Sequence, residues 1–257
     1  MIYIAFLVFT FLVLGIAFYQ WQYIVIFSPT YYRNDDLAKN YEILSLITDD
    51  GVELEGVISE PSDATQTLLV FNGRAHDSVG LINKLCEAYP TIRIITFNYR
   101  SYGRSQGKAS EKKLLKDSLK IAEIIQKYYG DFSVLAYSIG TNLASFLASQ
   151  HKVNTLFLIA PFHSLAFLIK NKIGLDLKII LRYKFHTAKY IKSVPTPVYI
   201  FASIHDEIVD IKSTRALKPF IKSLVYYKEL EGIRHDNLMF DAQIITKINE
   251  VLDEKNI

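Results

Sequence analysis

Short apolar runs alternate with segments of helical periodicity over most of the chain. Each run is hydrophobic throughout rather than at every second position, which is typical of strands buried on both faces of a sheet. The segments between them repeat their apolar residues at helical spacing. This alternation predicts an α/β fold with a mostly parallel central sheet and helices on both faces. The expected strands are 67–72, 91–99, 132–137, 154–160, 197–203 and 225–230.

Two further strands are expected within residues 43–59, where the sequence reads ILSLITDDGVELEGVIS. The polar triplet Asp49-Asp50-Gly51 separates two runs of strand-forming residues, and this arrangement indicates a β-hairpin. No internal repeat or low-complexity run follows the hairpin. We therefore expect residues 43–257 to form one domain.

Residues 1–27 differ from everything after them, because they contain no charged side chain. The stretch from Ile2 to Tyr19 is almost wholly apolar and is close to the roughly 20 residues that span a bilayer. Tyr19, Trp21 and Tyr23 then follow where aromatic side chains are enriched at a membrane interface. The pattern predicts a single-pass membrane anchor over residues 1–27.

Two other interpretations of this segment fit less well. A cleavable signal peptide requires a basic start and a small-x-small cleavage site, which the segment lacks. A buried amphipathic helix requires a polar face, which the segment also lacks. The polar connector 28–42 leaves the orientation open, because Arg33 and Lys39 are offset by Asp35 and Asp36.

Composition narrows the classes of function. Half of the 257 residues are hydrophobic, enough for one sizeable core, and the net charge of +3 gives no reason to expect a nucleic-acid partner. The single cysteine, Cys86, excludes an internal disulfide and a cysteine-based zinc site. No spacing typical of metal ligands occurs elsewhere, and we expect no metal or organic cofactor.

The first candidate for chemistry is Ser138, at the end of an expected strand and directly before a helical segment. Tyr137 and Ile139 flank it, and the small residues Ala136 and Gly140 lie two positions away on either side. A sharp strand-to-helix turn with small neighbours exposes a serine hydroxyl above the sheet. The alternative is a serine that merely caps the helix.

Two more candidates follow the next strands of the same type. Asp206 comes just after the strand at 197–203, and His235 just after the strand at 225–230. Carboxyl ends of parallel strands meet at one edge of a sheet. A serine nucleophile needs a base to accept its proton and a third group to orient that base, and all three residue types fall at this edge.

Several stretches together resemble the α/β-hydrolase superfamily. They are VFNGRAHD, FNYRSYGRSQG, AYSIG, PVYIFASIHDEIVD and GIRHDN, spread over roughly residues 43 to 257. More narrowly, the chain looks like the membrane-anchored lipases, esterases and depalmitoylases of that superfamily. The resemblance implies an α/β-hydrolase fold with Ser138 as nucleophile, His235 as general base and Asp206 as its orienting acid. Asp210 is the rival acid.

The resemblance also implies an oxyanion hole built from two backbone amides. One is the amide of Ile139, which follows the nucleophile. The other is expected from the loop that follows residues 67–72, where relatives commonly carry histidine and glycine and this chain has Asn72, Gly73 and Arg74. By position the Arg74 amide is the donor, and Gly73 permits the turn. Asn72, Tyr137 and Gly140 are expected to shape the site.

The segment 163–192, called the cap segment below, is where this superfamily places its cap. One acid, Asp176, accompanies a series of basic residues interleaved with apolar ones, and such a segment can lie on an anionic membrane surface. An ordinary lid with a solvated basic face is an equal alternative. The basic residues are Lys170, Lys172, Lys178, Arg182, Lys184, Lys189 and Lys192.

These features predict a membrane-anchored serine hydrolase that cleaves an ester or thioester, with an acyl or lipid-type substrate. A peptidase of the same fold is the alternative within enzymes. A non-catalytic, hydrolase-like membrane interaction protein is the alternative from another class, and it is disfavoured because all three residues for catalysis are present. The substrate and the side of the membrane stay open.

Overall fold

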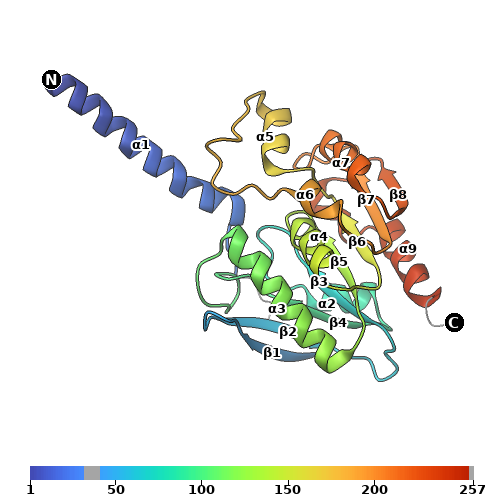
Figure 1. The fold of residues 1–257 in the computed structure, drawn as a ribbon. Coiled ribbons are helices and arrows are strands. Elements are labelled where there is room, and N and C mark those ends of the chain that lie inside the picture. Colours follow the sequence, from blue (N-terminus) through green and yellow to red (C-terminus); the bar gives the residue numbers. More distant parts are fainter. Residues whose placement is uncertain (32–40, 255–257) are drawn as a thin grey trace.

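The computed structural model describes residues 1–31 and 41–254 (Figure 1). Residues 32–40 of the expected connector lie outside the described residues, and with them Arg33, Asp35, Asp36 and Lys39, on which the orientation argument rests.

An eight-stranded sheet forms the centre of the domain, in the order β1-β2-β4-β3-β5-β6-β7-β8. The hairpin β1–β2 is antiparallel and joins β4 antiparallel, whereas all later neighbours are parallel. This confirms the predicted mostly parallel sheet. The strands are β1 Tyr41–Ile47, β2 Glu53–Ser59, β3 Thr67–Phe71, β4 Arg93–Phe97, β5 Ser133–Tyr137, β6 Leu156–Ile159, β7 Val198–Ser203 and β8 Leu224–Leu230.

Helices cover the sheet on both faces, as the all-apolar strands require. Every residue of β3, β5 and β6 is buried, which is possible only if both faces are covered. The edge strand β8 is only partly buried. The helices of the domain are α2 Ile82–Ala88, α3 Glu111–Tyr129, α4 Gly140–Gln150, α5 Leu165–Ile173, α6 Thr187–Ile191, α7 Ile211–Leu217, η1 Lys218–Phe220, α8 His235–Leu238 and α9 Ala242–Asp253.

The N-terminal segment is a single helix, α1 Ile2–Phe27, that projects away from the domain (Figure 1). It is the one helix among the described residues that is long and apolar enough to cross a membrane. At about 1.5 Å per residue, its 26 residues extend about 39 Å. Its apolar side chains are exposed over most of this length, and only Gln22 and Phe27 are buried.

The last two turns of α1 pack on the domain. The Phe27 ring lies 4.8 Å from that of Tyr183 and 5.9 Å from that of Phe185, centroid to centroid. The Gln22 side chain accepts a hydrogen bond from the Arg182 amide at 2.8 Å. The predicted anchor and helix α1 both end at residue 27, and the last turns of the helix also contact the domain.

The cap segment contains α5 and α6, with an irregular stretch between them (Figure 1). The predicted short helical cap is therefore present, although only part of it is helical. No residue of α5 is fully buried, and large apolar side chains of this segment are exposed. These are Ile173, Leu175, Ile179 and Ile180.

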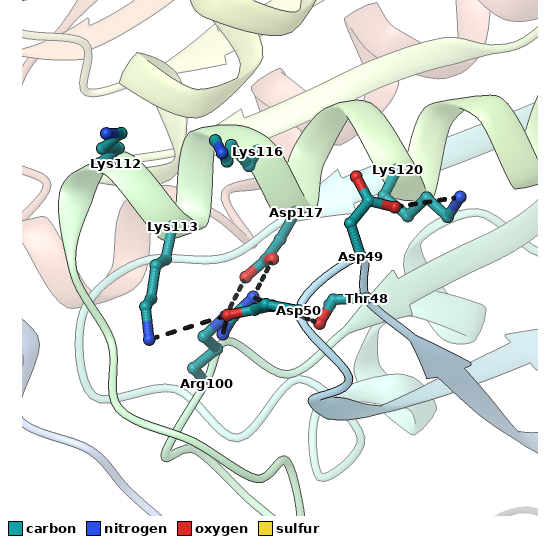
Figure 2. Close-up of a pocket in the computed structure, with 9 residues that line it drawn as sticks. All are labelled: Thr48, Asp49, Asp50, Arg100, Lys112, Lys113, Lys116, Asp117 and Lys120. Carbon is teal, nitrogen blue, oxygen red and sulfur yellow. Dashed lines mark hydrogen bonds and ion pairs between the residues drawn. The ribbon is translucent and has the colours of Figure 1, made fainter.

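The loop after β4 is held by a buried arginine rather than by catalytic groups. Arg100 is 2% exposed, and its guanidinium donates to both carboxylate oxygens of Asp117 at 2.7 Å and to the carboxylate of Asp50 (Figure 2). These contacts join the loop to α3 and to the β1–β2 turn.

Candidate active site

Ser138 lies in a sharp turn between β5 and α4. Its φ angle is 54°, in the left-handed region that residues with a side chain rarely adopt. The turn depends on Gly140, since a Cβ atom at that position would lie 2.4 Å from the carbonyl oxygen of Phe71. The Ser138 amide donates to the carbonyl of Ile159 on β6 at 2.9 Å, which fixes the turn to the sheet.

The three side chains selected from the sequence meet at the carboxyl edge of the sheet. The Ser138 hydroxyl donates to His235 Nε2 across 3.1 Å, and His235 Nδ1 donates to Asp206 Oδ2 across 2.7 Å. Nδ1 carries the proton because an ionised carboxylate can only accept. Nε2 is then left as the acceptor that faces the hydroxyl. All three residues are at least 92% buried, with exposures of 6–8%.

Asp206 is held by its own loop. Its Oδ1 atom accepts hydrogen bonds from the amides of Ile208 at 2.9 Å and Val209 at 2.7 Å, while Oδ2 faces His235. The amides stabilise the charged carboxylate and fix its plane. The rival acid, Asp210, caps α7 by accepting from the Lys212 amide at 2.7 Å.

Tyr137 braces the histidine. Its hydroxyl donates to the main-chain carbonyl of His235 at 2.7 Å, and the two rings lie 5.0 Å apart. Burial, the largest cause, and the nearby charge of Asp206 raise the pKa of Tyr137 well above its ordinary value. The hydroxyl therefore remains a donor. His76 stacks near Tyr137 at 5.6 Å between ring centroids, and burial lowers the pKa of His76.

Glu207 is a site residue that the sequence analysis missed. Its Oε2 atom accepts from the His235 amide at 3.2 Å, and its Oε1 atom accepts from Arg234 Nη2 at 2.9 Å. A hydrogen bond from its own amide, followed by that from Arg234, lowers the pKa of Glu207 to about 2. The signal available in the sequence was its position next to Asp206.

The loop after β3 lies beside Ser138. Gly73 is required there, because a Cβ atom would come within 2.8 Å of the Tyr137 ring. Asn72 points into the protein, where its amide donates to the Ser78 hydroxyl at 2.9 Å, so it braces the loop from beneath. The Arg74 side chain is exposed, and its guanidinium donates to the carbonyl of Val25 in α1 at 2.6 Å.

Two backbone N–H groups at the site make no hydrogen bond within the part of the chain that the structure describes. They belong to Arg74 and Ile139. Both residues line the same cavity as Ser138. The sequence analysis named these two amides as oxyanion donors, and the structure leaves both available.

The cavity beside Ser138, called the site cavity below, has a volume of about 720 Å³. This volume lies within the range of roughly 300–1,000 Å³ that is usual for ligand sites. Apolar side chains from α1, the end of the loop after β6, the cap segment and the Asp206 loop provide most of its wall. They are Val25, Ile26, Phe162, Leu165, Leu168, Ile169, Phe185, Ile208 and Val209.

The remaining histidines lie elsewhere or at the margin. His76 lines the site cavity. His163 and His186 face one another in the cap segment, with ring centroids 5.5 Å apart. Among the described residues, no group of three or more His, Cys, Asp or Glu side chains is arranged to hold a metal ion.

No protein-family model matches the chain. Alpha/beta hydrolase domain-containing protein 17C of Homo sapiens is 25% identical over 205 residues, which cover 74% of this chain and 58% of that protein. An uncharacterized protein of Mycobacterium tuberculosis is 28% identical over 213 residues, covering 77% and 74%. The chain spans about three fifths of the length of the 17C relatives that it matches.

Solved structures match more of the chain. An esterase of Pyrococcus furiosus superimposes with a TM-score of 0.70 at 16% identity, covering 88% of this chain and 96% of that one. An α/β-hydrolase of Vibrio vulnificus gives 0.67 at 17% identity, covering 84% and 81%. The fold is thus the α/β-hydrolase fold.

Proposed function

We propose that this protein is a membrane-anchored serine hydrolase that cleaves an ester or thioester of an acyl or lipid-type substrate. The observation that carries the proposal is the hydrogen-bonded series from Ser138 through His235 to Asp206, at 3.1 Å and 2.7 Å. Ser138 and His235 line an apolar cavity of about 720 Å³. A nucleophile, a base and an orienting acid are the groups that acyl transfer requires.

The first half of the reaction forms an acyl-enzyme. His235 Nε2 takes the hydroxyl proton as Ser138 Oγ attacks the carbonyl carbon of the substrate. The bond to the leaving oxygen or sulfur then breaks, and His235 passes the proton to the leaving alcohol or thiol. Asp206 stabilises the imidazolium that exists between these two steps.

The second half releases the acid. Water enters, His235 accepts its proton, and the hydroxide formed attacks the acyl carbon. The bond to Ser138 Oγ breaks, and the serine regains a proton from His235. In both halves, the unengaged amides of Arg74 and Ile139 are suited to bind the negatively charged oxygen, and one such donor is worth about 3 kcal/mol.

The membrane part of the proposal rests on α1 and the cap segment. The Arg182 guanidinium lies 4.1 Å from the ring centroid of Tyr19, so the cap segment contacts the helix at the level of the expected interfacial aromatics. Exposed Ile179, 94% accessible, lies next to Lys178 in the same segment. Such a surface suits the border between lipid headgroups and acyl chains.

The comparisons support the chemical class. The superimposed Pyrococcus furiosus protein is named an esterase, and the human relative is named for its hydrolase domain. These names describe those proteins, and their extension to this chain is part of the proposal.

Labelling with a fluorophosphonate, which reacts with activated serines, tests the proposal on membranes from cells that express the full chain. Wild type should be labelled, and the labelled protein should stay in the pellet after an alkaline carbonate wash. Ser138→Ala should lose all labelling. Ser149→Ala is the matched control, because Ser149 lies at the far end of α4 and should be labelled like wild type.

Persistent labelling of Ser138→Ala would refute the nucleophile. A folded wild type that reacts with no serine-directed probe would favour the non-catalytic interaction protein, and release by carbonate would contradict the anchor. A panel of acyl esters, acyl thioesters and aminoacyl amides would separate the proposed activity from that of a peptidase. Cleavage of the amides alone would overturn the ester or thioester assignment.

A further inference from the structure

The end of α1 contributes directly to the site cavity. Val25 and Ile26, from its last turn, line the same cavity as Ser138. A simple tether would end before the domain and leave the cavity to the domain alone. Here the helix that is apolar enough to cross a membrane also provides part of the wall next to the nucleophile.

A second apolar wall comes from α5 of the cap segment. Leu165, Leu168 and Ile169 line the cavity together with the residues of α1. The two helices thereby supply aliphatic side chains that a polar substrate would not need. An acyl chain would remove this surface from water, which is favourable by the hydrophobic effect.

The last turn of α1 is fixed in place by hydrogen bonds to its free carbonyls. The final carbonyls of a helix have no partner within the helix. The Val25 carbonyl accepts from Arg74 at 2.6 Å, and the Phe27 carbonyl accepts from the Tyr102 hydroxyl. Since Arg74 belongs to the loop beside Ser138, the helix and this loop are held together.

An apolar face of α1 continues from the cavity toward the N-terminus. Residues three and four positions apart lie on the same side of a helix. Val25 is therefore followed on its face by Trp21 and then Phe18, whose rings stack at 6.0 Å. Trp21 is 56% exposed, so this face offers apolar surface outside the cavity.

We propose that the last turn of α1 is part of the substrate site and forms one wall of an acyl-chain cleft between α1 and α5. The acyl chain of a membrane-resident ester or thioester would lie along the Phe18–Trp21–Val25 face and reach Ser138 directly from the bilayer. This inference rests on the proposed hydrolase function and names the substrate class of that site. It assigns a role in substrate selection to the anchor.

The test compares long and short acyl substrates on the purified full chain in lipid–detergent micelles. The measured quantity is the ratio of kcat/KM for p-nitrophenyl palmitate to that for p-nitrophenyl butyrate. Ile26→Trp fills the cleft from the α1 side and should lower this ratio at least about tenfold, since misfit in an apolar pocket changes discrimination by roughly 10–200-fold. Val25→Trp is the second variant, because Val25 is 39% exposed and a larger side chain there leaves the core unchanged.

Ile24→Trp is the matched control. Ile24 lies in the same turn, is 65% exposed, and does not line the cavity. Its ratio should equal that of wild type. An unchanged ratio in both Ile26→Trp and Val25→Trp would overturn the inference, as would an equal fall in Ile24→Trp.

The two proposals fail in different ways. If wild type is not labelled by fluorophosphonate and cleaves neither ester, the proposed function itself is wrong. If wild type is labelled and cleaves butyrate while the two cleft variants keep the wild-type ratio, the hydrolase stands and only the role of α1 fails.

Discussion

Two polar clusters stand at loops that follow strands of the sheet, and they differ in which of their polar groups stay free to act. In the first, Ser138, His235 and Asp206 are joined in series next to a cavity of about 720 Å³. In the second, Arg100 lies between Asp117 and Asp50 beside a cavity of about 360 Å³ (Figure 2).

In the second cluster, every nitrogen of the Arg100 guanidinium is engaged. All three guanidinium nitrogens donate to carboxylates, with Nε bound to Asp117, Nη1 to Asp50 and Nη2 to both. Arg100 therefore holds the pKa of the Asp50 carboxyl well below its ordinary range. Lys113 and Lys120, which line the adjacent cavity, are also paired with acids, at 3.8 Å and 3.3 Å (Figure 2).

The Ser138 cluster keeps capacity for a reaction. Nε2 of His235 can take a proton, and two nearby amides make no hydrogen bond in the described part of the chain. The difference teaches that burial and ion pairing alone do not identify a functional site. What marks the site is a set of unengaged donors and one acceptor that converge on an apolar cavity.

The largest expected effect comes from Asp206→Asn. The asparagine oxygen can still accept from the Ile208 and Val209 amides, so the loop should stay folded, but its NH₂ group cannot accept from His235 Nδ1. The imidazole would lose its orientation and tautomer, and kcat for a short ester should fall roughly 10⁴-fold, the size of this change in a well-studied serine protease. The control is Asp210→Asn, which keeps a residue able to cap α7 and should retain wild-type kcat. If Asp210→Asn loses kcat and Asp206→Asn keeps it, the orienting acid is Asp210 instead.

The next prediction concerns the Arg100 cluster. Arg100→Met should leave the buried Asp117 carboxylate without a partner and lower the free energy of unfolding by about 3–5 kcal/mol. At about 2–4 °C per kcal/mol, the melting temperature in detergent should fall by roughly 6–20 °C. The kcat per fluorophosphonate-reactive site should stay unchanged.

The double variant Arg100→Met with Asp117→Leu sharpens this test, because it removes the buried charge together with its partner. It should melt at a higher temperature than Arg100→Met alone. A large fall in kcat per reactive site in either variant would show that the Arg100 and Ser138 clusters are functionally coupled. The Arg100 cluster would then not be purely structural.

Local features of the sequence were enough to predict the mostly parallel α/β architecture and the positions of the three central residues. The strand runs and the small residues around Ser138 are short-range patterns, and the parallel sheet then brings strand ends together. The turn at Ser138 connects this short-range pattern with the tertiary structure. A residue larger than glycine at position 140 would clash with the carbonyl oxygen of Phe71 at the end of β3. The run at 225–230 behaves differently, because β8 lies at the edge and buries only part of its surface.

Tertiary contacts account for what the sequence analysis missed. The hydrogen bond from Arg74 to Val25 joins residues 49 positions apart, and no local pattern signals it. The predicted anchor over residues 1–27 was drawn from hydropathy, which does not indicate that Gln22 and Phe27 pack on the domain. Gln22, a polar residue inside the apolar run, was the available sign of that contact.

The smallest expected effect separates an ion pair at the site from one elsewhere. Glu207 and Glu229 both have a pKa lowered to about 2, the first by its own amide and Arg234, the second chiefly by Arg215. A carboxylate with a lowered pKa stabilises the folded state above its ordinary pKa near 4.5, and that contribution is lost as the pH falls toward 2. Glu207→Gln and Glu229→Gln should each lower the melting temperature slightly at pH 7, and each difference should shrink between about pH 4.5 and 2.

Only Glu207→Gln should also lower kcat, by a few-fold, because Glu207 accepts from the His235 amide. Equal kcat values for the two variants would mean that the Glu207 contact stabilises the fold without positioning His235.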